Sequence, residues 1–410
     1  MTMPDRPRSR INWHRIHSIF GLTASLFLAF MFLTGTLLVF SHEIDRVLDS
    51  RSHIDPTPGG KVSWGRVYDA IVADNPGRSV VRMVRSEDAS ISDLVVVLEP
   101  DSKGDRGLLV NPYNGQVLGY ANRHKFHAIM LQLHERLFVE GRKGRLLVSV
   151  FALPLTVAII AGIMTYRRFW TGFFRLPRRS GSSRAFFSGL HRLIAVWSLV
   201  FFVPMALTSL WYFAEAAGLG VQTEANFRTE RRETLLPDAF DGARLDAAIQ
   251  IAAEAMPSQV VSEVRLPRAK FESIVVLGQA TAILVTERQN SIHIDPETLN
   301  IVGIQRAEDL SLHQRISAAA DPIHFGLWGG LTTKILYTGF GIALTALAVF
   351  GIVINAKRLS AMEAKRPTGP ARSAFGRTWR AMGPYGSGAW LSVGLIAWGL
   401  GNMLYILLFT

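Results

Sequence analysis

The sequence predicts an α-helical integral membrane protein. A duplicated unit of helix, small α/β module and helix forms a four-helix core, and one extra transmembrane helix follows at the C-terminus. Five apolar stretches approach or exceed the roughly 20 residues that a helix needs to cross a bilayer. A histidine opens such a stretch twice, at His17 and His191, and a threonine follows at the same interval in both copies, at Thr34 and Thr208. Two long polar segments between the stretches share one order of predicted helix and strands.

Composition and charge distribution exclude several classes of protein. The chain of 410 residues contains no cysteine, which excludes thiolate-bound iron–sulfur clusters, cysteine-ligated zinc and covalently attached c-type haem. Any metal must be held by histidine, carboxylate or methionine. The net charge of +12 is concentrated in three short segments, which hold 18 Lys and Arg beside only Asp5 and Glu363. This pattern is typical of cytoplasmic loops, so we expect no nucleic acid partner and place the two long segments outside.

The elements alternate along the chain between apolar spans and polar segments. Basic residues precede the first span, as in a secretory signal, but its roughly 25 apolar residues exceed the ~7–15 of a signal peptide, so an uncleaved helix is expected. The last span has no titratable residue, which favours a lipid-facing supporting helix. The predicted order is a cytoplasmic basic arm 1–15, span 16–41, first module and approach 42–143, span 144–166, cytoplasmic loop 167–189, span 190–213, second module and approach 214–331, span 332–356, cytoplasmic loop 357–386 and span 387–410.

Each long polar segment is predicted to fold into a helix followed by strands. The first helix is expected to end at the Asn-Pro-Gly sequence that begins at Asn75, and the second, over 245–255, to end before Pro257. The last part of each module is typical of a strand, a proline-containing turn and a strand. The predicted strand segments are 79–85, 93–100 and 107–120 in the first module, and 260–267, 272–279, 282–288 and 291–305 in the second.

A further histidine follows each module and precedes the next apolar span. When His134 is aligned with His324, a basic residue follows 11 or 10 positions later in the two copies. The chain is therefore expected to form two parallel repeats around a four-helix core. This arrangement puts one pair of histidines near the cytoplasmic face and another near the opposite face.

These two pairs of histidines are the leading candidate site. Ionisable side chains at the edges of apolar spans are functional candidates, because burying them costs free energy unless they are paired or coordinate something. Neutral imidazole is the commonest metal ligand, and two histidines from different helices favour bis-histidine haem. Zinc or copper fits less well, since neither pair has a third ligand at short spacing. Structural histidines bonded to the backbone or to lipid remain the alternative. The pairs are His17 with His191, and His134 with His324.

Two other histidines are secondary candidates. His42 lies 25 residues after His17, about 340° round a helix, so both share one face, and His42 could bind the outer haem or the substrate. His124, His127 and His134 fall within one arc of roughly 80° on a helix. Of these, His127 is a candidate ligand or proton relay, and His124 is expected at the surface.

The remaining histidines are weaker candidates or none. His14, beside Arg15, is expected at the lipid headgroups, and His313 is a possible ligand without further support. His53 and His293 are expected at the surface of the modules. No residue is identified as catalytic.

The sequence resembles the PepSY-associated transmembrane family of bacterial inner-membrane proteins over about residues 10–360. The motifs that carry the resemblance open or close the predicted spans. They are HR and H-x-x-x-G-L at the start of the first span, LVFSHEID at its end, FHAIMLQLHERLFV before the second, LHRLIAVWSL at the start of the third, and HFGLWGG before the fourth. Both long segments resemble PepSY modules.

The resemblance implies a haem b-containing ferrisiderophore reductase of the bacterial inner membrane. Its N-terminus would be cytoplasmic and both PepSY-like modules periplasmic. Two bis-histidine haems b would pass electrons from an unidentified cytoplasmic or quinol donor to a ferric siderophore or another ferric chelate. By position, His17 and His191 would bind the inner haem, and His134 with His324 the outer one, with His127 and His42 in support.

Two other functions stay open at this point. One is a non-catalytic membrane protein whose PepSY modules bind peptide or modulate a protease. The other is a permease that moves intact siderophore. The fifth span departs from the shortest members of the family.

Overall fold

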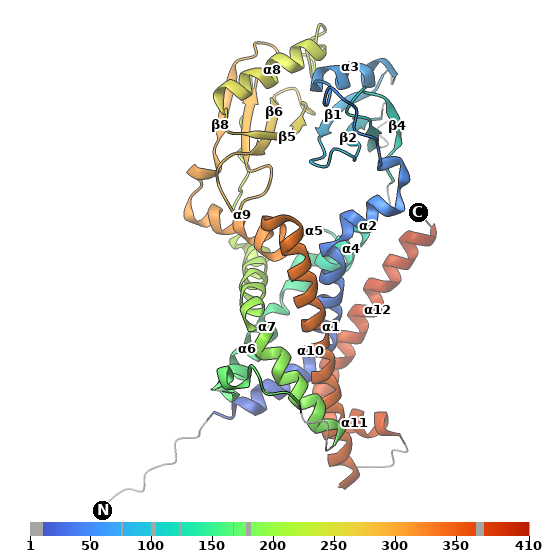
Figure 1. Ribbon diagram of the computed structural model, residues 1–410, viewed down its shortest axis with the longest axis vertical. Helices are drawn as coiled ribbons and strands as arrows, with labels where there is room; N and C mark the ends of the chain where they lie inside the picture. The colour runs from blue at the N-terminus through green and yellow to red at the C-terminus, as the bar shows by residue number, and fades with distance from the viewer. Residues whose placement is uncertain are drawn as a thin grey trace, which may run out of the picture. The chain divides into compact units, whose positions relative to one another are not determined.

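The computed structural model describes residues 11–74, 77–99, 104–122, 125–166, 168–177, 182–365 and 373–409. These residues form two compact units (Figure 1). The helical unit takes its described residues from Met1–Phe40, Ala128–Leu219 and His324–Thr410, and the sheet unit takes them from Ser41–His127 and Gly220–Ile323. His124, most of the predicted basic arm and parts of both predicted cytoplasmic loops lie outside the described residues.

Five segments of the helical unit are long and apolar enough to cross a membrane, so the chain is an α-helical membrane protein. These candidate spans are Trp13–Val39, Gly141–Thr165, Ser183–Leu219, Leu327–Lys365 and Ala374–Phe409. The α-helices are α1 Trp13–Val39, α2 Ser41–Leu48, α3 Trp64–Asp74, α4 Phe126–Arg136, α5 Gly141–Ser149, α6 Ala152–Thr165, α7 Ser183–Ala214, α8 Gly242–Ala255, α9 Leu312–Phe325, α10 Gly330–Lys365, α11 Ala374–Met382 and α12 Gly386–Phe409. The short helices are η1 Ser50–Ser52, η2 Phe169–Gly172, η3 Glu215–Leu219, η4 Ala307–Asp309, η5 Leu327–Gly329 and η6 Gly383–Tyr385.

Several helices extend beyond the apolar stretches that mark them in the sequence. Helix α7 begins at Ser183 because the Ser182 hydroxyl caps it by accepting a hydrogen bond from the Ala185 N–H. Helix α10 continues to Lys365, and α11 follows within the segment predicted as a loop. Hydropathy identifies only the part of a helix that suits hydrocarbon, so polar helical ends are missed.

The fifth span packs against the first. Ser392 of α12 donates a hydrogen bond to the carbonyl of Thr23 in α1 (3.3 Å). A Cβ added at Gly388 would lie 2.8 Å from the Cβ of Thr23, so glycine allows the two helices to approach closely. Trp398 donates to the carbonyl of Leu137 (3.0 Å), just after α4. These contacts are those expected of a supporting helix.

The sheet unit contains one antiparallel sheet of eight strands in the order β4-β3-β2-β1-β5-β6-β7-β8 (Figure 1). Strands β1–β4 follow α3, strands β5–β8 follow α8, and β1 pairs with β5 to join the two runs. The strands are β1 Ser79–Val84, β2 Asp93–Leu98, β3 Asp105–Val110, β4 Val117–Tyr120, β5 Val260–Arg265, β6 Ile274–Gln279, β7 Asn290–Ile294 and β8 Ile301–Gln305.

One face of this sheet packs on α3 and α8 around a continuous apolar core. Alternate strand residues such as Val264 and Ile292 are fully buried against Leu245 and Ala248 of α8.

Both predicted module helices and most predicted strands are confirmed. The strand predicted over 282–288 is wrong: this stretch is a loop between β6 and β7. The apolar residues of this loop do not pack in the main core. Val285 packs in a small separate cluster with Ala307.

Helices α3 and α8 lie side by side over the strands and touch through two glycines. The N–H of Gly65 donates to Asp246 (2.7 Å), and the N–H of Gly242 donates to Asp69 (2.7 Å). Each aspartate therefore caps the neighbouring helix. A Cβ on either glycine would overlap the carbonyl of the other.

We expect Gly242→Ala to destabilise the sheet unit by about 1–3 kcal/mol, because the added methyl group must separate the two helices. The measurement is the thermal unfolding of the purified protein. Gly394→Ala in α12 is a matched control, since a Cβ there meets nothing within 4 Å. Equal melting temperatures for Gly242→Ala and the wild type would contradict the proposed close contact.

Candidate functional site

His17 and His191 face each other inside the helical unit. They come from α1 and α7, and their ring centres are 6.3 Å apart. Nδ1 of His17 lies 2.8 Å from the carbonyl oxygen of Ala158 in α6, and Nδ1 of His191 lies 2.9 Å from that of Leu347 in α10. A carbonyl oxygen only accepts, so Nδ1 carries the proton in both rings. Nε2 is then the nitrogen with a lone pair, as a metal ligand requires.

Glycines on the neighbouring helices make room for these two rings. Gly162 follows Ala158 by four residues, and Gly351 follows Leu347 by four. A Cβ at Gly162 would lie 3.5 Å from Cε1 of His17, and one at Gly351 would lie 3.4 Å from Cε1 of His191. The two rings therefore rest in equivalent positions, each held by a carbonyl one helical turn before a glycine.

His134 and His324 form the second facing pair, with ring centres 6.4 Å apart. Nδ1 of His134 lies 2.9 Å from the hydroxyl oxygen of Thr34, and Nδ1 of His324 lies 2.8 Å from that of Thr208. Both threonine hydroxyls donate to carbonyls of their own helices. Their oxygens can therefore accept from Nδ1–H, which again leaves Nε2 unprotonated.

Helix α1 packs closely against His134 of this second pair. A Cβ at Gly35 would come within 3.0 Å of Cε1 of His134. Each histidine also lies at the end of its helix: Leu137 and Phe138 have positive φ directly after α4, and Gly326 has positive φ directly after α9. These breaks end the short helices that carry the histidines before α5 and α10 begin.

The two pairs lie at different levels along α1 and α7. These helices carry His17 and His191 and, further along, the threonines that bond His134 of α4 and His324 of α9. The interval from His17 to Thr34 on α1 equals the interval from His191 to Thr208 on α7. At about 1.5 Å per residue this interval corresponds to ~25 Å along each helix axis, close to the ~30 Å thickness of the hydrocarbon core. The pairs therefore occupy opposite ends of the helical unit.

The separation of the ring centres in each pair matches the separation expected if one iron were held by both imidazoles. A metal–nitrogen bond of about 2 Å and the ~1.1 Å from ring nitrogen to ring centre place the two ring centres about 6 Å apart. The observed separations are 6.3 and 6.4 Å. In the part of the chain that the structure describes, no three His, Cys, Asp or Glu side chains come together as a metal site.

His42 and His127 form a third contact, of a different kind, in the sheet unit. Their rings stack with centres 3.9 Å apart and planes 22° apart. Stacked rings at this distance leave no room for an iron between them. The Ser41 hydroxyl bonds Nδ1 of His127 (2.8 Å), and burial lowers the pKa of His127 below its usual value. The ring is thus neutral at pH 7.

The other described histidines lie outside these pairs. His14, His53 and His313 are exposed. His293 was predicted at the surface, and this prediction is wrong, since only 5% of it is exposed. Its ring nitrogens lie 2.9 and 3.2 Å from the hydroxyls of Ser273 and Ser291, which satisfy them inside the unit.

Sequence reasoning identified the paired histidines but not the groups that orient them. In the sequence, Thr34 and Thr208 stand out only by their equal interval after His17 and His191, and Ala158 and Leu347 carry no signal. The equal spacing of histidine and threonine was the available clue, because a repeated polar residue in an apolar helix suggests a partner.

Fold and sites together define a polytopic membrane protein whose helical unit carries two pairs of facing histidines. Residues 14–358 match the family described as the PepSY-associated TM region. The chain belongs to this family, as the resemblance implied. It is also similar to an uncharacterised protein, PA4219, of Pseudomonas aeruginosa, with 24% identity over 258 residues. The match covers 58% of this chain and 65% of the relative's length.

Proposed function

We propose that this protein is a haem-containing reductase of the bacterial inner membrane that passes electrons across the membrane to a ferric siderophore in the periplasm. One observation carries the proposal: two histidine pairs, one at each end of α1 and α7, have ring separations suited to one iron each. In all four rings Nδ1 is held by an oxygen, so that Nε2 is the ligating nitrogen.

Haem b bound at both pairs would supply one-electron transfer, and two imidazole ligands would leave no coordination position for substrate. The chain's own residues orient these ligands. The carbonyls of Ala158 and Leu347 and the hydroxyls of Thr34 and Thr208 fix the tautomer and the ring plane, and they raise the basicity of Nε2.

We also propose that the chain is an internal duplication of one helix–module–helix unit and that it has a defined orientation in the membrane. The order of helix and four strands occurs twice, the interval from histidine to threonine occurs twice, and each Nδ1 contact has a counterpart in the other half. By the positive-inside tendency the basic segments would be cytoplasmic and the sheet unit periplasmic. A ferric chelate reduced on that side would release its metal, since hard oxygen chelators hold Fe(II) less tightly than Fe(III).

A visible spectrum of protein purified from membranes tests the proposal. We expect a bis-histidine Soret band and α-band after reduction with dithionite, and about two haems b per chain by pyridine haemochrome assay. Adding a ferric siderophore to the reduced protein should reoxidise the α-band. Protein expressed with ample haem supply that contains no haem would exclude this function.

The two alternative functions predict different results in these experiments. A non-catalytic PepSY protein would lack the chromophore and keep its function after His17→Ala. A permease would take up a redox-inert gallium siderophore, which a reductase would not release.

A further inference from the structure

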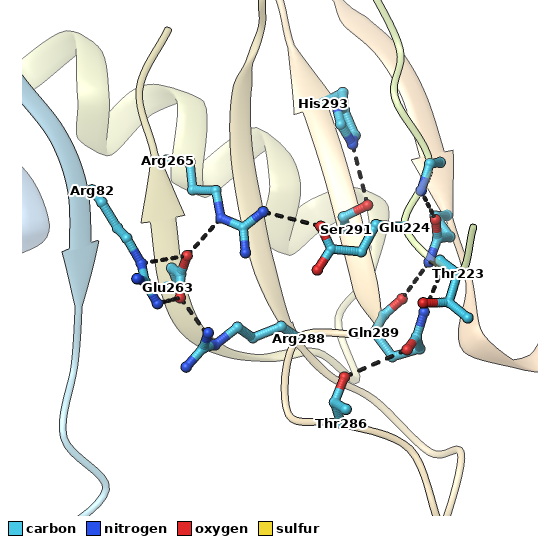
Figure 2. Close-up of polar contacts among 12 residues, drawn as sticks. Arg82, Thr223, Glu224, Glu263, Arg265, Thr286, Arg288, Gln289, Ser291 and His293 are labelled. Carbon is cyan, nitrogen blue, oxygen red and sulfur yellow. Dashed lines mark hydrogen bonds and ion pairs between the residues drawn. The ribbon is translucent and has the colours of Figure 1, made fainter. Parts of the chain in front are cut away.

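A buried carboxylate in the sheet unit holds three arginines together (Figure 2). Glu263 of β5 has no exposed surface. It accepts two hydrogen bonds of 2.8 Å from Arg82 of β1, through Nε and Nη2. It also accepts one of 2.6 Å from Nε of Arg265, and Nε of Arg288 lies 2.9 Å from its other oxygen. One negative charge therefore positions three positive charges.

These guanidinium groups have further N–H donors besides those that bond Glu263. Each has five N–H donors, and the side chains of Arg82, Arg265 and Arg288 remain 33%, 34% and 40% exposed. Arg265 also pairs with Glu224 at 3.2 Å, but that carboxylate is 57% exposed and can be displaced. The cluster retains positive charge, and the buried carboxylate has already ordered it. Such preorganised guanidinium groups bind carboxylates in a bidentate manner at low entropic cost.

The three arginines line a cavity of about 400 Å³, which is within the usual size range of small-molecule sites. The cavity lies on the sheet face that α8 does not cover, because its lining residues alternate with the core residues of the same strands. The segment 222–227 closes the other side, where the ring of Phe227 packs edge-on against His293.

The lining of this cavity is part charged and part apolar, and its four arginines, with Arg268 as the fourth, outnumber its two carboxylates, Glu224 and Glu272. Val275 and Leu277 of β6 form apolar wall beside the arginines. His293 adds no charge, because burial and the nearby Arg265 lower its pKa to about 4. An inorganic phosphate ion would use the guanidinium groups but leave the apolar wall and most of the volume empty. The lining suits an anion with a carbon skeleton.

We propose that this cavity binds a small organic anion that carries two or more carboxylate groups. The carboxylates bind Arg82, Arg265 and Arg288, and the carbon skeleton packs on Val275 and Leu277. The site is distinct from the histidine pairs, and binding there requires no haem. The inference therefore stands independently of the proposed reductase activity.

Calorimetric titration of the full chain in detergent at low salt tests this site, with citrate as the probe. We expect saturable binding, weakened about tenfold or more in Arg288→Gln, because a charged hydrogen-bond donor is lost. Arg288 is the choice that disturbs the fold least, as it makes a single contact with Glu263. Arg306→Gln is the control, since Arg306 is exposed in the same unit and does not line the cavity.

The outcomes separate the possibilities. Thermal unfolding must show that Arg288→Gln is folded, and the haem-deficient His191→Ala variant should bind citrate as the wild type does. Failure of the wild type to bind citrate would overturn the proposal, and so would equal affinity in wild type and Arg288→Gln. Inorganic phosphate that binds as tightly as citrate would overturn the requirement for an organic anion.

Discussion

Under the proposed function, replacing His191 by alanine is expected to reduce the haem content from two haems per chain to one. His191 faces His17 at 6.3 Å, whereas the second pair is ~25 Å away along α1 and α7. The loss of one axial ligand should therefore leave the haem at His134 and His324 in place. Pyridine haemochrome quantitation per protein, together with a redox titration, measures the result.

His313→Ala is a suitable control, because His313 is exposed and lies outside both pairs. It should retain two haems. A His191→Ala protein that also retains two haems would show that this pair does not bind the cofactor. Folded His191→Ala protein without any haem would contradict the independence of the two sites.

At the pair of His134 and His324, Thr208→Val tests how much the orientation of His324 contributes to haem binding, because the ligand itself is kept. The substitution removes the acceptor for Nδ1–H of His324 and keeps the side-chain shape. We expect the haem to remain bound but with about 10- to 100-fold lower affinity, as for other groups that orient metal ligands. The reduction potential of that haem should rise, since a less basic imidazole stabilises ferric iron less. An unchanged potential would mean that Thr208 does not bond to the ligand.

The membrane-spanning part of the fold could be read from the sequence because each span depends on local composition. The facing pairs could be inferred because His17 and His191 both open apolar spans and are followed by a threonine at the same interval. The bonds to Thr34 and Thr208 could not, because each joins two helices that are far apart along the chain. The sequence supplies a spacing, whereas the partner depends on how the helices pack.

The cluster of Arg82, Arg265 and Arg288 around Glu263 could not be predicted from the sequence for a similar reason. Alternation in β5 correctly puts Glu263 on the face opposite Val264, which in an isolated module would be a solvated face. The pairing of β1 with β5 changes this, because it brings Arg82 opposite Arg265. This pairing joins segments that are far apart along the chain, so the sequence alone indicates neither the continuous sheet nor the burial of Glu263 and His293.

Replacing Glu263 by glutamine is expected to lower the free energy of unfolding of the sheet unit by about 3 kcal/mol. Removing one partner of a buried ion pair typically costs about 3–5 kcal/mol, and the lower end applies because the three arginines are partly exposed. Without the carboxylate, Arg82, Arg265 and Arg288 repel one another. Thermal unfolding at pH 7 measures the loss. Glu254→Gln, an exposed change on α8, should leave the melting temperature unchanged.

The dependence on pH distinguishes loss of charge from loss of packing. Burial acts to raise the pKa of Glu263, but hydrogen bonds from Arg82 and Arg265 and the charge of Arg288 lower it below its ordinary value of 4.5. A carboxyl group with a lowered pKa in the folded state stabilises the fold above its unfolded pKa. That contribution disappears as the pH falls through the folded pKa. The difference in stability between wild type and Glu263→Gln should therefore be constant from pH 7 to about 5 and shrink below pH ~4. A difference that persists unchanged in acid would mean that the side chain stabilises the sheet by its shape rather than its charge.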